Sequence, residues 1–257
     1  MKLLTLISDW KLRDPYIGMV KGELCKAFPD AHIIDITHAV EPGNVPQTAF
    51  LLRNAFTSFP ERTLHLILTG TTGSCNANPV LMPYRNHYFM GADNGIFSLI
   101  TENEPIERAW ICPTPSSEIS IPHRMIQMAR WLYDQKLDGK AEEYTTFNKK
   151  TAPYPDYNFI ANSLKGQIVY IDSNCNAVTN ISSSLFREYV GNKKFSATLG
   201  SRKQLKVHKF YERYQPNEFD IYLTVNRLEF IEITINGGAL AVLASLQVGD
   251  AVEINIL

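Results

Sequence analysis

The sequence predicts an α/β N-terminal domain, built on a mostly parallel sheet with covering helices, followed by a C-terminal all-β domain. Apolar strands and amphipathic helices alternate through residues 1–150, a pattern typical of a parallel sheet. After Gly166 the pattern changes to several short strands with few helices, which is typical of a sandwich or a barrel. We therefore expect domains at 1–150 and 166–257, joined by a linker at 151–165.

The N-terminal elements follow from apolar runs and from helical spacing. Residues 3–8 form an apolar run that predicts a buried strand. Asp14 and Pro15 then indicate a helix start, with Asp14 as the N-cap and Pro15 at the first helical position. The same reasoning predicts further strands at 32–36, 63–69 and 87–90 and further helices at 45–59 and 121–133.

In the C-terminal half, short apolar runs predict strands at 167–171, 195–198, 219–225, 230–235 and 251–256, and a short helix at 237–246. The stretch from 171 to 181 stands out because it carries Asp172, Asn174, Asn176 and Asn180. Short Asp and Asn side chains form turns, but a turn needs only one or two of them. The local pattern alone favours an Asx-rich loop between two strands, and the alternative is a surface that holds a ligand.

Composition limits the classes of function. Of the 257 residues, 45% are hydrophobic and 20% are charged. The net charge of −1 does not indicate binding to nucleic acid or to an anionic membrane. The apolar run at 1–7 is too short for a signal peptide, and the four cysteines and six histidines are dispersed. We expect a soluble, cytoplasmic protein with no metal site, whose cysteines are free thiols.

In parallel sheets, ligands bind beyond the carboxyl ends of the strands, where the loops converge. Residues 8–9, 35–38 and 69–74 all fall at such ends, so chemistry is expected there first. Asp9 falls at the first of these ends, so it is a candidate ligand-binding residue. The alternative for Asp9 is a loop or helix-capping aspartate.

Five groups of residues stand out in order along nearly the whole chain: Ser8-Asp9 with Asp14-Pro15-Tyr16-Ile17-Gly18; Ile36-Thr37-His38 with Pro42; Asp93-Asn94-Gly95; Ile171-Asp172 to Asn176 with Thr179-Asn180-Ile181; and Asn236-Gly237-Gly238-Ala239 before Gly249-Asp250. As an ordered set they resemble the landmark motifs of the S-adenosylmethionine hydrolase and halogenase family, which includes the fluorinases. The resemblance implies a C-terminal β-barrel and a homotrimer with S-adenosylmethionine sites at subunit interfaces. It also implies in-line displacement at the ribose C5′ carbon with methionine leaving, without a metal or a separate cofactor.

The resemblance also implies roles for individual residues. Asp9 matches the family's ribose-binding aspartate, and Asp172 matches the position that meets the methionine ammonium group. Asn176 matches the position that binds the adenine edge, which backbone groups around Asn236 and Gly237 would complete. Asp14 falls where the family has a further methionine contact, although helix capping is the favoured role.

The chain departs from the hydrolases at their catalytic residues. Residues 66–76 contain neither the acid nor the arginine of the family motif, and the candidate replacement base is His123. The alternative for His123 is a helix-end histidine bonded locally. Gly43 replaces an aromatic residue of the family, and Arg227 with Glu229 stands where the family has small residues.

Several functions follow from these observations. The first is hydrolysis of S-adenosylmethionine to adenosine and L-methionine by water or hydroxide, or of a related nucleoside or sulfonium substrate accommodated through Gly43 and Arg227. The second is a catalytically inactive protein of the same fold that binds S-adenosylmethionine or adenosine. The third is a halogenase, because the segment 69–73 resembles the threonine-rich part of that motif.

Overall fold

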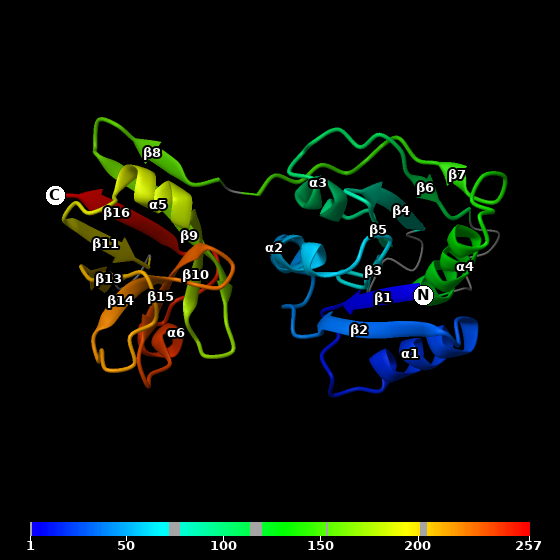
Figure 1. The fold of residues 1–257 in the computed structure, drawn as a ribbon, viewed down its shortest axis with the longest axis horizontal. Coiled ribbons are helices and arrows are strands. Elements are labelled where there is room, and N and C mark those ends of the chain that lie inside the picture. Colours follow the sequence, from blue (N-terminus) through cyan, green and yellow to red (C-terminus); the bar gives the residue numbers. More distant parts are fainter. Residues whose placement is uncertain (1, 72–77, 114–119, 153, 201–204) are drawn as a thin grey trace. The chain divides into compact units, whose positions relative to one another are not determined.

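The computed structural model describes residues 2–71, 78–113, 120–152, 154–200 and 205–257. The chain divides into two compact units, Met1–Ala152 and Pro153–Leu257 (Figure 1). The segment expected as a linker, 151–165, carries β8 (Asp156–Asn158) and the beginning of β9 (Ser163–Ile171), which pair with each other. This pairing places most of that segment within the second unit.

The first unit is built on one sheet, in which the described strands have the order β2-β1-β3-β5-β4-β6-β7. The parallel part comprises β1 (Lys2–Ile7), β2 (Ala31–Thr37), β3 (Leu64–Ile67) and β5 (His87–Ala92). Strands β4 (Pro79–Tyr84), β6 (Trp110–Ile111) and β7 (Glu142–Glu143) extend it in antiparallel pairs. The predicted α/β domain with a mostly parallel sheet is therefore confirmed.

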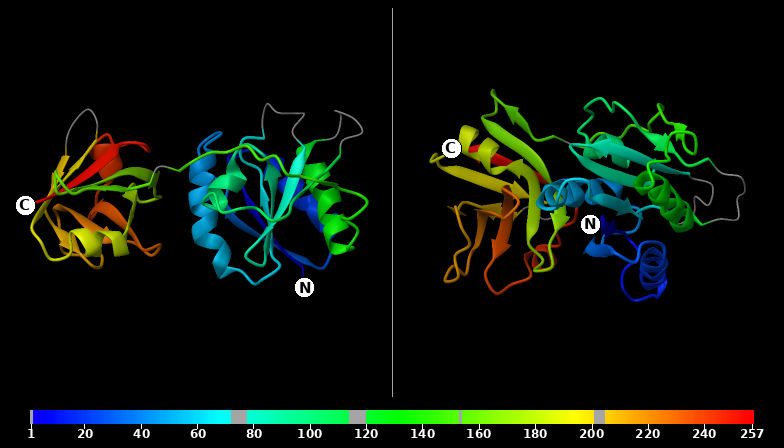
Figure 2. Two further views of the ribbon diagram at one scale, coloured as in Figure 1. Left: turned by 90° about the horizontal axis from the view of Figure 1, so that it is seen from above. Right: turned by 45° about the vertical axis from the view of Figure 1, so that its right-hand side comes forward.

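Helices cover both faces of this sheet (Figure 2). On one face, α1 (Tyr16–Ala27) and α4 (Ile121–Tyr133) bury Leu24 and Met125 against Leu4 and Leu66. On the other face, α2 (Val45–Ala55) and α3 (Ile96–Ile100) pack on Ile67. Burial of these apolar side chains is what holds the helices to the sheet.

The expected start and end of two helices need correction. Pro15 is the N-cap of α1, and no side chain caps the helix, so the predicted capping by Asp14 is wrong. The predicted helix at 45–59 ends at Ala55 and is followed by a 3₁₀ turn, η1 (Phe56–Ser58). Its N-cap is Asn44, whose Oδ1 accepts a hydrogen bond from the backbone N–H of Gln47 at 3.0 Å.

The second unit is a curled sheet that resembles half of a barrel, so the predicted all-β C-terminal domain is confirmed (Figure 1). Its described strands have the order β12-β11-β16-β9-β10-β15-β14-β13, with β8 on β9. The remaining bounds are β10 (Ala177–Ser182), β11 (Phe195–Leu199), β12 (Leu205–Val207), β13 (Phe210–Tyr211), β14 (Ile221–Val225), β15 (Phe230–Ile235), β16 (Ala251–Ile256), α5 (Ser183–Tyr189) and α6 (Leu240–Leu243). Its core includes Leu164, Phe186, Leu223 and Ile233.

Candidate functional site

Asp9 lies directly beyond the carboxyl end of β1, and its carboxylate is fixed by backbone groups from two other loops. Its Oδ2 accepts hydrogen bonds from the N–H of Gly43 at 2.7 Å and from the N–H of Gly70 at 3.1 Å. The residue is 8% exposed, and Oδ1 is buried without a hydrogen-bond partner among the described residues. Buried polar atoms nearly always have a hydrogen-bond partner. A carboxylate that is held in place but has one open oxygen, meaning a buried oxygen without a hydrogen-bond partner, is therefore a candidate ligand-binding group.

The two glycines owe their role to backbone conformation. Gly43 follows β2 and has φ +68°, and Gly70 follows β3 and has φ +67°. Only glycine adopts this left-handed region without a steric penalty. The loops after β2 and β3 can therefore both turn an N–H toward the carboxylate that follows β1.

Asn94 brings a second open acceptor to the same edge of the sheet. It follows β5, and its Nδ2 donates to the carbonyl oxygen of Thr69 at 3.1 Å. Its Oδ1 is buried and has no partner in the part of the chain that the structure describes. A Cβ built on Gly70 would lie 3.0 Å from Asn94 Nδ2, which places Asn94 directly beside the Gly70 turn. Open acceptors on Asp9 and Asn94 suit a ligand that offers hydroxyl or amine donors.

A chain of polar side chains, buried at Ser8 and His38 and exposed at Asp35, supports the end of β1. Ser8 Oγ lies 2.7 Å from Nδ1 of His38, and Nε2 of His38 lies 3.1 Å from Oδ1 of Asp35. Burial alone would raise the pKa of Asp35, but hydrogen bonds from Lys21 and His38 outweigh it and lower that pKa. Ser8 is fully buried, so this serine, histidine and aspartate position the loop before Asp9 and do not present a nucleophile.

The two other candidate residues of the N-terminal domain, Asp14 and His123, lie in surroundings that differ from those of Asp9. Asp14 is exposed in the turn before α1. His123 is on α4, where its Nδ1 lies 2.8 Å from Ser120 Oγ and its Nε2 lies 3.4 Å from Glu23 on α1. These partners belong to helices and not to the loops around Asp9. Residues 72–77 and 114–119 lie outside the residues that the structure describes. They include part of the segments that correspond to the catalytic motifs of the hydrolases.

In the second unit, Asp172 and Asn176 form the turn between β9 and β10. Asp172 Oδ1 accepts from the N–H groups of Asn174 at 2.9 Å and Asn176 at 2.8 Å, and its Oδ2 accepts from Asn176 Nδ2 at 3.2 Å. Asn176 Oδ1 accepts in turn from the hydroxyl of Thr234 on β15 at 2.6 Å. The local pattern alone favoured a loop through 171–181, but the turn is short and β10 begins at Ala177.

Asn236 and Gly237 follow β15 and lie close to this turn in the fold. Asn236 hydrogen-bonds through its side chain to Tyr214 Oη and to the carbonyl oxygen of Pro216. Gly237 has φ +68°, as the turn into α6 requires. The N–H of Ala241 in α6 donates to the carbonyl oxygen of Cys175 at 2.9 Å, which joins the two predicted motifs.

Sequence reasoning missed Glu232, which lies on β15 beside the same turn. Burial is the main cause that raises the pKa of Glu232 to about 7, and the negative charge of Asp172 raises it further. Burial and Asp172 likewise raise the pKa of Tyr170 on β9. An acidic residue inside the apolar run 230–235 was the signal that could have identified it.

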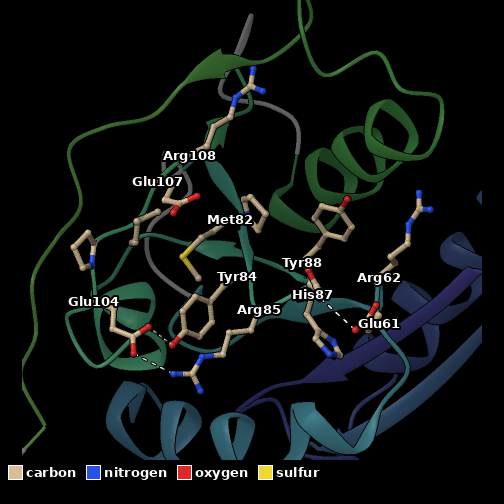
Figure 3. Close-up of a pocket in the computed structure, with 14 residues that line it drawn as sticks. Glu61, Arg62, Met82, Tyr84, Arg85, His87, Tyr88, Glu104, Glu107 and Arg108 are labelled. Carbon is tan, nitrogen blue, oxygen red and sulfur yellow. Dashed lines mark hydrogen bonds and ion pairs between the residues drawn. The ribbon is translucent and has the colours of Figure 1, made fainter.

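A separate groove of about 610 Å³ lies at the β4–β5 hairpin (Figure 3). It is at the edge of the sheet opposite to Asp9, because His87 begins β5 whereas Asp9 follows the end of β1. Within it, Glu104 binds Arg85 at 3.0 Å and Tyr84 Oη at 2.8 Å. Arg85 and Glu104 of the groove are thus paired with each other, whereas the Asp9 edge offers buried acceptors without a partner among the described residues.

Two other kinds of feature have no support among the described residues. No group of three or more His, Cys, Asp or Glu side chains is arranged to hold a metal ion in the described part of the chain. None of the described helices has the length and apolar character needed to cross a membrane.

Comparisons with known proteins give the same result in both halves of the chain. The family model described as SAM hydroxide adenosyltransferase N-terminal domain matches residues 4–126, and the corresponding C-terminal domain model matches residues 166–253. The (R)-S-adenosyl-L-methionine hydrolase of Methanocaldococcus jannaschii is 31% identical over 112 residues, 42% of this chain and 43% of the relative. The protein of the same name from Thermus thermophilus is 28% identical over 124 residues, 48% of each chain. The chain thus spans about half the length of these curated relatives.

Two solved structures share the fold across both units. An uncharacterized conserved protein from Thermotoga maritima matches with a TM-score of 0.82 at 22% identity, over 98% of this chain and 99% of that chain. A conserved hypothetical protein from Thermus thermophilus matches with a TM-score of 0.70 at 21% identity, over 100% of both chains.

Proposed function

The chain belongs to the SAM hydroxide adenosyltransferase family, and we propose that it binds S-adenosyl-L-methionine and hydrolyses it to adenosine and L-methionine. Two relatives that carry the name (R)-S-adenosyl-L-methionine hydrolase support this proposal. The observation that carries it is the Asp9 carboxylate, which backbone groups hold in place and which keeps one buried oxygen open.

In the proposed complex, Asp9 accepts hydrogen bonds from the ribose hydroxyls. A vicinal diol offers two donors, and a carboxylate that is already oriented loses little freedom on binding them. Asp172 supplies a carboxylate for the ammonium group of the ligand, and Asn176 supplies an amide for the adenine edge. Backbone groups at Asn236 and Gly237 complete the adenine contacts. These roles require no metal and no separate cofactor.

The proposed reaction is a single displacement. An oxygen of water attacks the ribose C5′ carbon while the bond between C5′ and sulfur breaks, and the electron pair of that bond stays on sulfur. The cationic sulfonium becomes the neutral thioether of methionine, and the proton lost by water passes to solvent. Alignment of water, C5′ and sulfur supplies much of the rate enhancement in such a reaction.

We also propose a homotrimer with the sites at subunit interfaces.

A second candidate function is an adenosyl-binding protein without turnover. It is favoured by the turn from Leu68 to Thr71, which carries no ionisable side chain in a segment that directly adjoins Asp9. The hydroxyl groups of that turn are also engaged within the protein. Thr71 Oγ1 donates to the carbonyl oxygen of Leu68 at 2.9 Å, and Thr69 Oγ1 lies 3.0 Å from Thr48 Oγ1. A halogenase function has no comparable support from these groups.

Chromatography of S-adenosylmethionine incubated with the full chain tests the proposal. We expect adenosine and methionine to appear in equal amounts, with wild-type protein and with Asp30→Ala, a control at an exposed turn. Asp9→Ala should lose most of this activity. Intact ligand after incubation, with binding retained, would replace the hydrolase by the binding protein. A 5′-halogenated nucleoside formed only with added fluoride or chloride would identify a halogenase.

A further inference from the structure

One face of the second unit carries a row of side chains that continues from the Asp172–Asn176 turn. Val178 on β10 pairs with Tyr170 on β9 and with Glu232 on β15, and Glu232 pairs with Thr224 on β14. Directly paired residues of antiparallel strands share a face of the sheet, and so do residues two positions apart on one strand. Tyr170, Val178, Glu232 and Thr224 therefore lie on the same face as Thr234, whose hydroxyl donates to Asn176 Oδ1 at the turn.

This face holds two acids that no described cation neutralises. Among the described residues, neither Asp172 nor Glu232 forms an ion pair with a lysine, an arginine or a histidine. Asp172 is satisfied by three N–H donors of its own turn. Glu232 has only the Asn226 side chain as a hydrogen-bonding neighbour that favours its charged form. Glu232 is therefore the side chain on this face that a bound cation would stabilise most.

Thr224 adds a second and independent sign of a ligand. It pairs with Glu232 across the strands, it is 3% exposed, and its Oγ1 has no hydrogen-bond partner within the described ranges. A buried hydroxyl without a partner has lost its water contacts and gained nothing in return. A ligand ammonium group carries three donors, and it could reach a hydroxyl oxygen and a carboxylate together.

We propose that this face binds the cationic tail of an S-adenosyl sulfonium that ends in an amine and lacks a carboxylate, and that Glu232 is the residue that selects it. The proposal rests on the proposed function, because it assigns a substrate class to the same site. An ammonium group gains from two facing acids, whereas a ligand carboxylate is repelled by both. Hydrolysis of the decarboxylated form of S-adenosylmethionine by the same displacement would release adenosine and 3-(methylthio)propylamine.

Calorimetric titration at pH 8 with three ligands tests this selectivity. The ligands are adenosine, S-adenosylmethionine and decarboxylated S-adenosylmethionine, and the proteins are wild type, Glu232→Gln and Glu232→Asp. Glu188→Gln, at an exposed position of α5, is the matched control. We expect wild type to bind the decarboxylated ligand about tenfold more tightly than S-adenosylmethionine, a difference on the order of 1.4 kcal/mol.

The variants separate selectivity from folding. Glu232→Gln should bring the two affinities to within about threefold, and Glu232→Asp should preserve most of the preference. Adenosine, which has no tail, should bind all four proteins equally. If adenosine binds but wild type shows no preference, or if Glu232→Gln keeps the preference, the inference is overturned. If adenosine does not bind wild type at all, the proposed function fails and the inference fails with it.

Discussion

The backbone N–H of Gly70 donates a hydrogen bond to Oδ2 of Asp9 over 3.1 Å, although the two residues are 61 positions apart in the chain. The contact joins the ends of β1 and β3, which are neighbours in the sheet. It orients the carboxylate that the proposed ribose contact requires.

Gly70→Ala should damage this edge and lower stability. The residue has φ +67°, and an added Cβ would lie 3.0 Å from Asn94 Nδ2. We expect the free energy of unfolding to fall by about 1 to 3 kcal/mol, measured by urea denaturation. Gly22→Ala is the control, because Gly22 lies within α1 with nothing within 4 Å of a built Cβ. That variant should gain about 0.5 to 1 kcal/mol. Equal stability of the two variants would contradict the assigned role of the Gly70 turn.

Ser8→Ala should show that the chain of Ser8, His38 and Asp35 positions Asp9 and does not carry out chemistry. The change leaves Nδ1 of His38 without its partner in a buried site, which we expect to cost about 1 to 3 kcal/mol of stability. Adenosine affinity should fall less than it does in Asp9→Ala. Ser58→Ala, at an exposed position of η1, should change neither quantity. Complete loss of turnover in a Ser8→Ala protein with normal affinity would indicate a direct catalytic role instead.

His65 should make the protein sensitive to acid. Its Nδ1 lies 2.7 Å from Thr5 Oγ1, and its Nε2 lies 3.1 Å from His87 Nδ1. Burial, with a smaller effect of His87, lowers the pKa of His65 from 6.5 to about 3. Between these values the unfolded chain binds a proton that the folded chain does not. Stability should therefore fall as the pH decreases from 6.5 toward 3, by on the order of 2 kcal/mol at pH 4.5.

Thermal unfolding of His65→Gln at pH 7.5 and 4.5 measures this contribution. The decrease in melting temperature from pH 7.5 to pH 4.5 should be smaller in the variant than in wild type. His32→Gln, at an exposed position of β2, should show the same decrease as wild type. If His65→Gln also shows the full wild-type decrease, other groups are responsible for the acid sensitivity.

Glu232 should have the opposite pH dependence. Burial and Asp172 raise the pKa of Glu232 from 4.5 to about 7, so the folded chain holds a proton that the unfolded chain releases between these values. Its contribution to stability is greatest below pH 4.5 and declines as the pH rises toward 7. Glu232→Gln, which cannot ionise, should melt at a higher temperature than wild type at pH 8. The two proteins should differ less at pH 4.5, and a constant difference at both pH values would contradict the assignment.

Hydrophobic periodicity in the sequence was sufficient to predict the long amphipathic helices. It was not sufficient to predict strands that contain polar residues. The helix predicted at 121–133 has those bounds in the structure, because its apolar stripe is continuous. Strand β10 was missed because Asn176 and Asn180 suggested a loop, whereas Thr234 satisfies Asn176 within the sheet. Pairing with a distant strand cannot be read from local pattern, and β8 was hidden for the same reason.

The candidate site was only partly predictable. The position of Asp9 follows from the rule that parallel strands end at one edge, and the resemblance to a family added Asp172 and Asn176. The role of Gly43 and Gly70 as donors depends on contacts between loops far apart in sequence, which the sequence alone does not show. Glu232 was missed because its unusual pKa arises from burial and from Asp172, which lies 60 residues earlier.

The measurement that tests the central claim most directly is a calorimetric comparison of adenosine with 2′-deoxyadenosine, in wild-type protein and in Asp9→Ala. If the open oxygen of Asp9 binds the ribose diol, wild type should bind adenosine about tenfold more tightly than the deoxy analogue. In Asp9→Ala this ratio should fall close to one. Loss of the ratio would establish Asp9 as the ribose-binding group. An unchanged ratio in Asp9→Ala would contradict the account.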